Sequence, residues 1–136
     1  MRQQRLVLQD YTGTERLLVV DDIQEQRDIA VRMLGKLGYQ VASASGGEEA
    51  VAYLKGHTID LMVLDMVMPP GIDGLEAYRR ILELRPGQKA IIASGYAPSD
   101  RVKTMQDLGA GEYIRKPYTL EKIGMAVRRE LDSKPS

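Results

Sequence analysis

The chain contains no cysteine, no excess of charge of one sign and no long hydrophobic run. Without cysteine there are no disulfides, no thiol catalysis and no cysteine-ligated metals. The 19 basic and 19 acidic residues balance, whereas a nucleic-acid-binding protein usually carries a basic surplus or stripe. No run approaches the roughly 18 apolar residues of a membrane span, and the N-terminus lacks the apolar segment of a secretory signal. We therefore expect a cytoplasmic protein that neither enters a membrane nor binds nucleic acid.

The length of 136 residues suits one domain with a sizeable core. Residues 1–15 show no sustained periodicity, and Gly13 separates them from the rest of the chain, so we predict an N-terminal linker or tail. Strand-like and helix-like segments then alternate five times. This alternation places the domain at residues 16–132 and leaves a short C-terminal tail at 133–136.

Short apolar runs bounded by turn residues are typical of buried strands. Three of the expected strands are continuously apolar: residues 17–20, 61–64 and 90–93. Two others, residues 40–44 and 113–115, are mixed in polarity. Parallel strands need crossover connections, so the alternation predicts an α/β fold with a doubly wound, five-stranded parallel sheet and helices on both faces. The flavodoxin-like strand order 2-1-3-4-5 puts the two mixed strands at the edges, where mixed polarity is common.

Apolar residues at helical spacing predict five helices. They follow Asp22, Ser45 and Asp73 and cover residues 99–108 and 119–131. Ser45 and Glu48 have the spacing of a capping box. The buried stripe of the first helix is expected to include Ile29.

Polar side chains stand where four of the apolar runs end: Asp21, Asp22, Asp65, Ser94 and Lys116. Ligands of an open parallel sheet gather at the carboxyl ends of its strands. In the order 2-1-3-4-5 the switch point lies between the first and third strands, so Asp21, Asp22 and Asp65 should end there side by side.

These residue types suit phosphoryl chemistry. Three carboxylates in one pocket repel one another unless a cation relieves them, and Mg²⁺ is the usual one. A carboxylate can also carry a phosphoryl group as an acyl phosphate. Asp65, alone on the central strand, is the better nucleophile, whereas Asp21 and Asp22 suit the metal. Lys116 and Ser94 would supply a positive charge and a directional hydrogen bond to the phosphoryl oxygens.

The set of strand-end residues, in this order, closely resembles the receiver domain of two-component response regulators over about residues 16–131. The resemblance implies that Asp65 accepts a phosphoryl group from a phosphohistidine on a histidine kinase or histidine phosphotransfer domain. It implies Mg²⁺ held by Asp22, Asp65 and the main-chain carbonyl of Val67, with Asp21 acting mostly through water. Such a domain is not an enzyme but a phosphoacceptor that assists its own phosphorylation and dephosphorylation.

The resemblance also implies a switch. Lys116-Pro117 would be a cis bond, the kind that proline tolerates. Tyr113 would turn inward when Ser94 moves toward the phosphoryl group. That movement would remodel the face formed by the fourth helix, fifth strand and fifth helix, through which a homodimer could also form.

Two features depart from the commonest receiver pattern. The stretch from Asp65 to Asp73 is one residue longer, which reshapes the loop containing Val67. Tyr96 stands two residues after Ser94, where a bulky side chain would influence access to the site. The longer loop resembles receivers attached to hybrid sensor histidine kinases.

Three other functions remain to be compared. An aspartyl-phosphate phosphohydrolase dependent on Mg²⁺ would need a second acid two residues after the nucleophile, where this chain has Val67. A flavin-binding protein of similar topology would need a phosphate-binding loop after the first strand. Residues 21–25 contain three acids instead, and these would repel phosphate without a metal. An unphosphorylated interaction module of the same fold is the third. His57 has no acidic neighbours that would make it a phosphodonor, so the donor histidine should lie outside this sequence.

Overall fold

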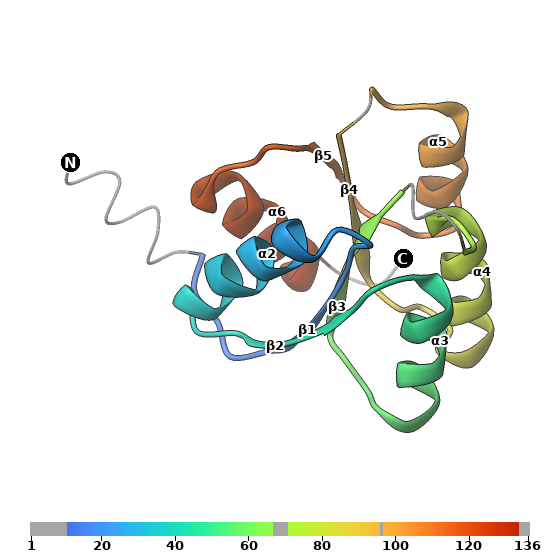
Figure 1. Ribbon diagram of the computed structural model, residues 1–136, viewed down its shortest axis with the longest axis horizontal. Helices are drawn as coiled ribbons and strands as arrows, with labels where there is room; N and C mark the ends of the chain where they lie inside the picture. Colours follow the sequence, from blue (N-terminus) through green and yellow to red (C-terminus); the bar gives the residue numbers. More distant parts are fainter. Residues whose placement is uncertain (1–10, 67–70, 96, 134–136) are drawn as a thin grey trace.

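The computed structural model describes residues 11–66, 71–95 and 97–133. They form one parallel sheet of five strands in the order β2-β1-β3-β4-β5 (Figure 1). The strands are β1 (Arg16–Val20), β2 (Gln40–Ala44), β3 (Leu61–Asp65), β4 (Ala90–Ser94) and β5 (Tyr113–Arg115). The predicted fold, strand order and mixed edge strands are therefore confirmed.

Helices cover both faces of the sheet. They are α2 (Gln24–Lys36), α3 (Gly47–Gly56), α4 (Gly74–Leu84), α5 (Asp100–Asp107) and α6 (Leu120–Asp132). Helices α2 and α6 lie on one face, and α3, α4 and α5 lie on the other (Figure 1). Side chains alternate across a strand, so Leu17 and Val19 of β1 pack toward the first pair while Leu18 and Val20 pack toward the other three. This two-sided burial explains why the central strands are apolar throughout. Of the helices in the described ranges, none is long and apolar enough to cross a membrane.

Two helices begin at side-chain caps. Asp73 accepts a hydrogen bond from the backbone N–H of Glu76, and Thr119 accepts one from Lys122. Each bond satisfies a backbone donor that the first helical turn leaves without a partner. The cap at Asp73 fixes the start of α4 directly after the longer loop.

The capping box predicted at Ser45 and Glu48 is wrong by one residue. Helix α3 begins after Gly46, so the acid of the first turn that reaches back is Glu49, which accepts from the backbone N–H of Ser45 at 2.9 Å. Glu48 instead accepts from the backbone N–H of Ile72, across the start of α4. Glycine is an acceptable N-cap residue, and it moves the helix start by one position.

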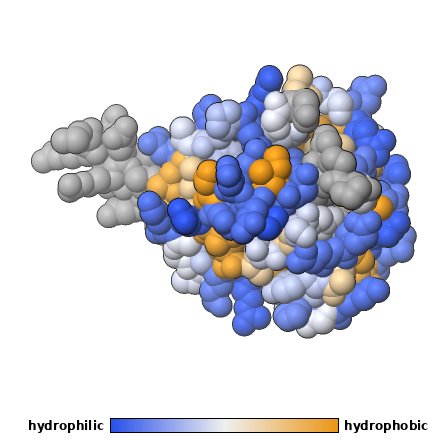
Figure 2. Space-filling model, in the orientation of Figure 1, coloured by the Kyte–Doolittle hydropathy of each residue, from blue (hydrophilic) through white to orange (hydrophobic). Residues whose placement is uncertain are grey.

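The prediction that Ile29 belongs to the buried stripe of α2 is also wrong. The buried face of α2 runs through Ala30 and Leu34. Ile29 precedes Ala30 by about 100° of helical rotation and is 48% exposed. Figure 2 shows hydrophobic surface interrupting the hydrophilic surface over the region where α2 lies.

Residues 11–15, which precede the predicted domain boundary, contact the domain. The backbone N–H of Gly13 donates to the carbonyl of Leu37, and that of Gln40 donates to the carbonyl of Glu15. The guanidinium of Arg128 on α6 binds the Glu15 carboxylate at 2.6 Å, which lowers the pKa of Glu15 mainly through this hydrogen bond. The boundary at residue 16 stays a prediction, but the segment before it is joined to α2, β2 and α6.

Replacing Arg128 with alanine is expected to lower the free energy of unfolding by about 1–2 kcal/mol, because charge-assisted hydrogen bonds to Glu15 would be lost. Urea denaturation measures the change. Arg129→Ala is the matched control, since its guanidinium is largely exposed and lies 3.6 Å from Glu112, and it should cost less than about 0.5 kcal/mol. Equal effects of the two substitutions would contradict a specific role for Arg128.

Candidate functional site

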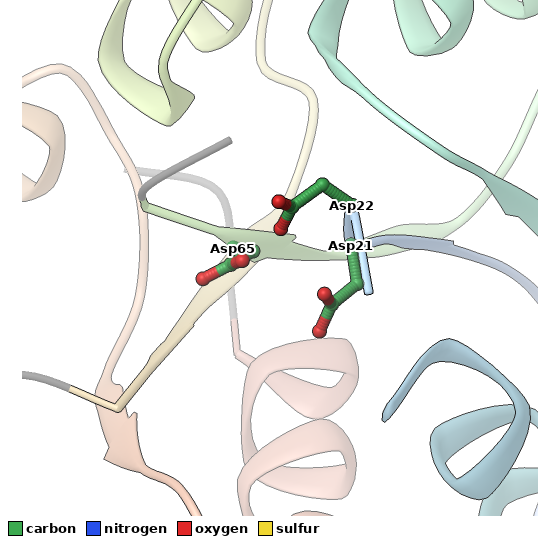
Figure 3. Close-up of side chains that lie close together, drawn as sticks. All are labelled: Asp21, Asp22 and Asp65. Carbon is green, nitrogen blue, oxygen red and sulfur yellow. The ribbon is translucent and has the colours of Figure 1, made fainter. Parts of the chain in front are cut away.

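Three carboxylates meet at the carboxyl edge of the sheet. Strand β1 pairs with β3 in a register that sets Val20 beside Leu64, so the residues at the carboxyl ends of these strands adjoin. Asp21, Asp22 and Asp65 each offer a carboxylate oxygen, and these oxygens lie within 4.8 Å of one another (Figure 3). Asp21 and Asp65 are buried and Asp22 is half-buried. The structure brings together the three acids as the strand order led us to expect.

Lys116 brings a positive charge to this cluster from the end of β5. Its ammonium nitrogen lies 2.5 Å from Asp21 Oδ2 and 3.6 Å from Asp65 Oδ1. The same ammonium donates a hydrogen bond to Gln26 Oε1 at 2.6 Å. The bond between Lys116 and Pro117 is cis, as the resemblance implies. The amine is thus half-buried among oxygen acceptors.

Ser94 ends β4, which lies between β3 and β5, and Tyr113 begins β5, the strand that Lys116 follows. The register of β3 and β4 pairs Asp65 with Ala93, which places Ser94 one residue further along the same edge, and Ser94 is buried. The backbone N–H of Lys116 donates to the carbonyl of Ser94 at 2.8 Å. Tyr113 is half-buried on β5 and packs against the core beneath α4 and α5. Val67 and Tyr96 lie outside the described residues.

Burial raises the pKa of Asp65 to about 6, although the nearby charge of Lys116 opposes the shift. The charges of Asp21 and Asp22 raise it further. The ionised form of Asp65 is therefore disfavoured in the folded chain without a metal. A cation that neutralises Asp22 and Asp65 would relieve this cost.

Without metal, Asp65→Asn is expected to stabilise the folded chain at pH 7.5 by about 2–3 kcal/mol, because a raised carboxyl pKa opposes folding once the group ionises. The sign follows from the two pKa values: the unfolded chain loses this proton near 3.8 and the folded chain near 6. Below the lower value both states are protonated, so the advantage of the Asp65→Asn chain should shrink between these values as the pH falls. Urea titrations of both chains in EDTA measure it, and a difference independent of pH would contradict this explanation.

Three neighbours of the acids are not apparent from strand ends alone. Gln26 contacts Lys116, and Arg27 Nη1 donates to the main-chain carbonyl of Asp21 at 2.7 Å. Tyr118 packs beside the cluster, and burial together with the charges of Asp21 and Asp65 raises its pKa to about 12. Gln26 and Arg27 lie in the first turn of α2, the helix that follows Asp22. This proximity to Asp22 in the sequence is the only signal that could have indicated that they contact the site.

The cluster offers donors suited to a hard divalent cation. Both oxygens of Asp21 are engaged, since Oδ1 accepts from the backbone N–H of Ile23 and Oδ2 from Lys116. Among the residues that the structure describes, Asp22 has no hydrogen-bond or ion-pair partner. Asp22 and Asp65 are thus the carboxylates available to a metal, and Mg²⁺ prefers oxygen ligands of this kind. The residues fit a magnesium ion.

Residues 17–128 match the family model of the response regulator receiver domain. This chain is a member of that family. It is 32% identical over 120 residues to sporulation initiation phosphotransferase F of Bacillus subtilis, covering 88% of this chain and 96% of that protein. It is 34% identical over 120 residues to the CAI-1 autoinducer sensor kinase/phosphatase CqsS of Vibrio cholerae, covering 86% of this chain but 17% of that protein. The receiver therefore spans nearly the whole of one relative and a small part of another.

Solved structures show the same fold. The receiver domain protein (CheY-like) from Methanospirillum hungatei superimposes with a TM-score of 0.81 at 29% identity, covering 88% of this chain and 95% of that one. A chain of the CheX-CheY-BeF3-Mg+2 complex from Borrelia burgdorferi superimposes with a TM-score of 0.79 at 29% identity, covering 85% of this chain and 87% of that one. Receiver domains are signalling modules of two-component systems, and they bind Mg²⁺ at an acidic pocket. The membership favours signalling over the phosphohydrolase and flavin-binding alternatives.

Proposed function

We propose that this receiver domain accepts a phosphoryl group on Asp65 from a phosphohistidine of a partner protein, in a reaction that requires Mg²⁺. The observation that supports the proposal is the position of Asp65. Its carboxylate ends the central strand among two further acids and lies 3.6 Å from the ammonium of Lys116. A nucleophile, a metal-binding group and a counter-charge for phosphoryl oxygens thus occupy one edge of the sheet.

The chemistry needs little from the protein beyond positioning and charge. An oxygen of Asp65 forms the new bond to phosphorus while the bond from phosphorus to the donor nitrogen breaks, and the histidine keeps that electron pair. Lys116 donates to the phosphoryl oxygens, and the hydroxyl of Ser94 adds a hydrogen bond. When bound, Mg²⁺ supplies charge neutralisation for those oxygens and relieves the repulsion among the carboxylates.

We assign the metal to Asp22 and Asp65, with the main-chain carbonyl of Val67 as a further ligand implied by family membership. Asp21 would act mostly through water, and its two hydrogen bonds to Ile23 and Lys116 are consistent with that indirect role. The half-buried position of Asp22 leaves it accessible from solvent.

We infer that phosphorylation alters the face formed by α5, β5 and α6. Ser94 and Tyr113 are the switch residues of this proposal: Ser94 moves toward the phosphoryl group and Tyr113 follows into the space it leaves. Tyr113 is half-buried on β5, beside the strand that Ser94 ends. This face would contact downstream partners and, where two copies pair, the second copy.

The partner is expected to be a histidine kinase or a histidine phosphotransfer domain. Relatives that contain a similar segment include the sensor kinases CqsS of Vibrio cholerae and CckA of Brucella abortus. His57, the only histidine of the sequence, stacks on Tyr53 beyond the end of α3 and is exposed. It follows a helix whose end lies away from the acids, so we expect the donor histidine on a partner protein.

Intact-mass measurement after incubation with acetyl phosphate tests the proposal. With Mg²⁺ the chain should gain one phosphoryl group, and with EDTA it should gain none. An unchanged mass in both conditions would favour the alternative of an unphosphorylated interaction module.

A further inference from the structure

The ammonium of Lys116 is held by two oxygen acceptors on the β1 side of the site. It donates to Asp21 Oδ2 at 2.5 Å and to Gln26 Oε1 at 2.6 Å. Its distance to Asp65 Oδ1 is 3.6 Å, which exceeds a charge-assisted hydrogen bond. An ammonium carries three N–H donors, so two are occupied by Asp21 and Gln26 and the third is available on the side of Asp65.

Gln26 is a neutral acceptor in a fixed position. An ammonium only donates, so the amide oxygen of Gln26 must face it. Gln26 is the third residue of α2 and is half-buried. Two hydrogen bonds join the start of this helix to Asp21. Arg27 donates to the main-chain carbonyl of Asp21, and the Asp21 side chain accepts from the backbone N–H of Ile23. Gln26 and Asp21 therefore form one rigid pair of acceptors.

We propose that Gln26 is a positioning residue, which together with Asp21 keeps the Lys116 ammonium separated from Asp65 so that a phosphoryl oxygen can enter between them. The proposal rests on the proposed function of Asp65 as phosphoacceptor. Without Gln26, Asp21 alone would hold the ammonium on the β1 side, and the ammonium would be free to move toward Asp65 and close the 3.6 Å separation. In the resulting direct ion pair, the ammonium would bind the lone pairs of the Asp65 carboxylate that attack phosphorus. It would also occupy the position that a phosphoryl oxygen takes between Lys116 and Asp65.

With acetyl phosphate as the donor, the phosphoryl group passes directly to Asp65. An oxygen of Asp65 forms the bond to phosphorus, the bond from phosphorus to the acetyl oxygen breaks, and acetate leaves with that electron pair. The positioned ammonium of Lys116 donates to a phosphoryl oxygen during the transfer and keeps its proton. Gln26 touches neither the donor nor the phosphoryl group, and it acts only through Lys116.

The test substitutes methionine for Gln26, which keeps the length of the side chain and removes the acceptor. The rate of phosphorylation by acetyl phosphate at saturating Mg²⁺ should fall roughly threefold to tenfold, the effect of losing one hydrogen bond of typical strength. Gln24→Met is the matched control, since Gln24 lies in the same helical turn with an exposed side chain, and its rate should equal that of the wild type. A Gln26→Met rate equal to the wild-type rate overturns the proposal while leaving Asp65 as the phosphoacceptor.

A double-mutant cycle with Lys116→Ala separates positioning from a general structural effect. If Gln26 acts through Lys116, Gln26→Met should not change the residual rate of the Lys116→Ala chain. An equal fold-loss in both backgrounds overturns the proposal. The crystal structure of the Gln26→Met chain should show the ammonium within hydrogen-bond distance of Asp65, and an unchanged separation overturns the proposal independently of any rate. A wild-type chain that gains no phosphoryl group overturns the proposed function itself.

Discussion

Replacing Asp65 with asparagine is expected to abolish phosphorylation of the chain by acetyl phosphate and Mg²⁺. The side-chain amide keeps the shape of the carboxylate but lacks its nucleophilic oxygen, so the loss should be on the order of a thousandfold or more. Because the substitution also removes a buried charge, the variant should fold at least as stably as the wild type. The yield of phosphorylated chain, measured by intact mass over time, gives the result.

The matched control for this prediction is Asp60→Asn. Asp60 precedes the same strand, β3, at its opposite end, and its carboxylate accepts from the backbone N–H of Arg16 at 2.8 Å. It carries the same charge but lies at the amino edge of the sheet, away from the acid cluster. Its phosphorylation should match the wild type. A phosphoryl adduct that persists at the wild-type rate in Asp65→Asn would contradict the assignment.

Removal of the Asp22 carboxylate should weaken Mg²⁺ binding by at least roughly tenfold, since even residues that only support metal ligands cost tenfold to a hundredfold when lost. Asp22 is the acid of the cluster with no hydrogen-bond or ion-pair partner in the described part of the chain, so its oxygens are available to the metal. Isothermal titration of the wild type and of Asp22→Ala with Mg²⁺ measures the difference.

Glu25→Ala is the control for Asp22→Ala. Glu25 lies in the first turn of α2 and is exposed, so its loss changes the net charge near the site by the same amount without removing a cluster carboxylate. Its effect on Mg²⁺ affinity should stay small because an exposed charge is screened by salt. If Asp22→Ala and Glu25→Ala weakened binding equally, Asp22 would act only through long-range charge and the ligand assignment would be wrong.

The order of the strands could be predicted from the sequence because the polarity of each strand reflects whether it lies at the centre or the edge of the sheet. Strands covered on both faces cannot carry polar residues cheaply, so 17–20, 61–64 and 90–93 had to be central. The start of α3 was harder to place. Ser45 and Gly46 are both acceptable N-cap residues, and consecutive acids come after them, so either glutamate could have closed the capping box. In the structure α3 begins after Gly46 and buries Gly47, Ala50 and Leu54.

The site was predictable as far as it depends on strand ends. Asp21, Asp65 and Lys116 follow or end parallel strands, and the order of the sheet alone brings them to one edge. The contact of Gln26 with Lys116 depends instead on how α2 lies across that edge. Burial of Ala30 and Leu34 against the sheet and α6 sets this orientation, and a single sequence does not state the angle between a helix and its sheet. The same orientation leaves Ile29 exposed.

Mapping the phosphorylated residue tests the central claim most directly. The wild-type chain is treated with acetyl phosphate and Mg²⁺ and then with borohydride, which reduces an aspartyl phosphate to homoserine. Peptide mass spectrometry locates the product. We expect homoserine at position 65 and at no other aspartate. Homoserine at Asp21 or Asp22, or none in a chain that has gained a phosphoryl group, would contradict the assignment of Asp65 as the phosphoacceptor.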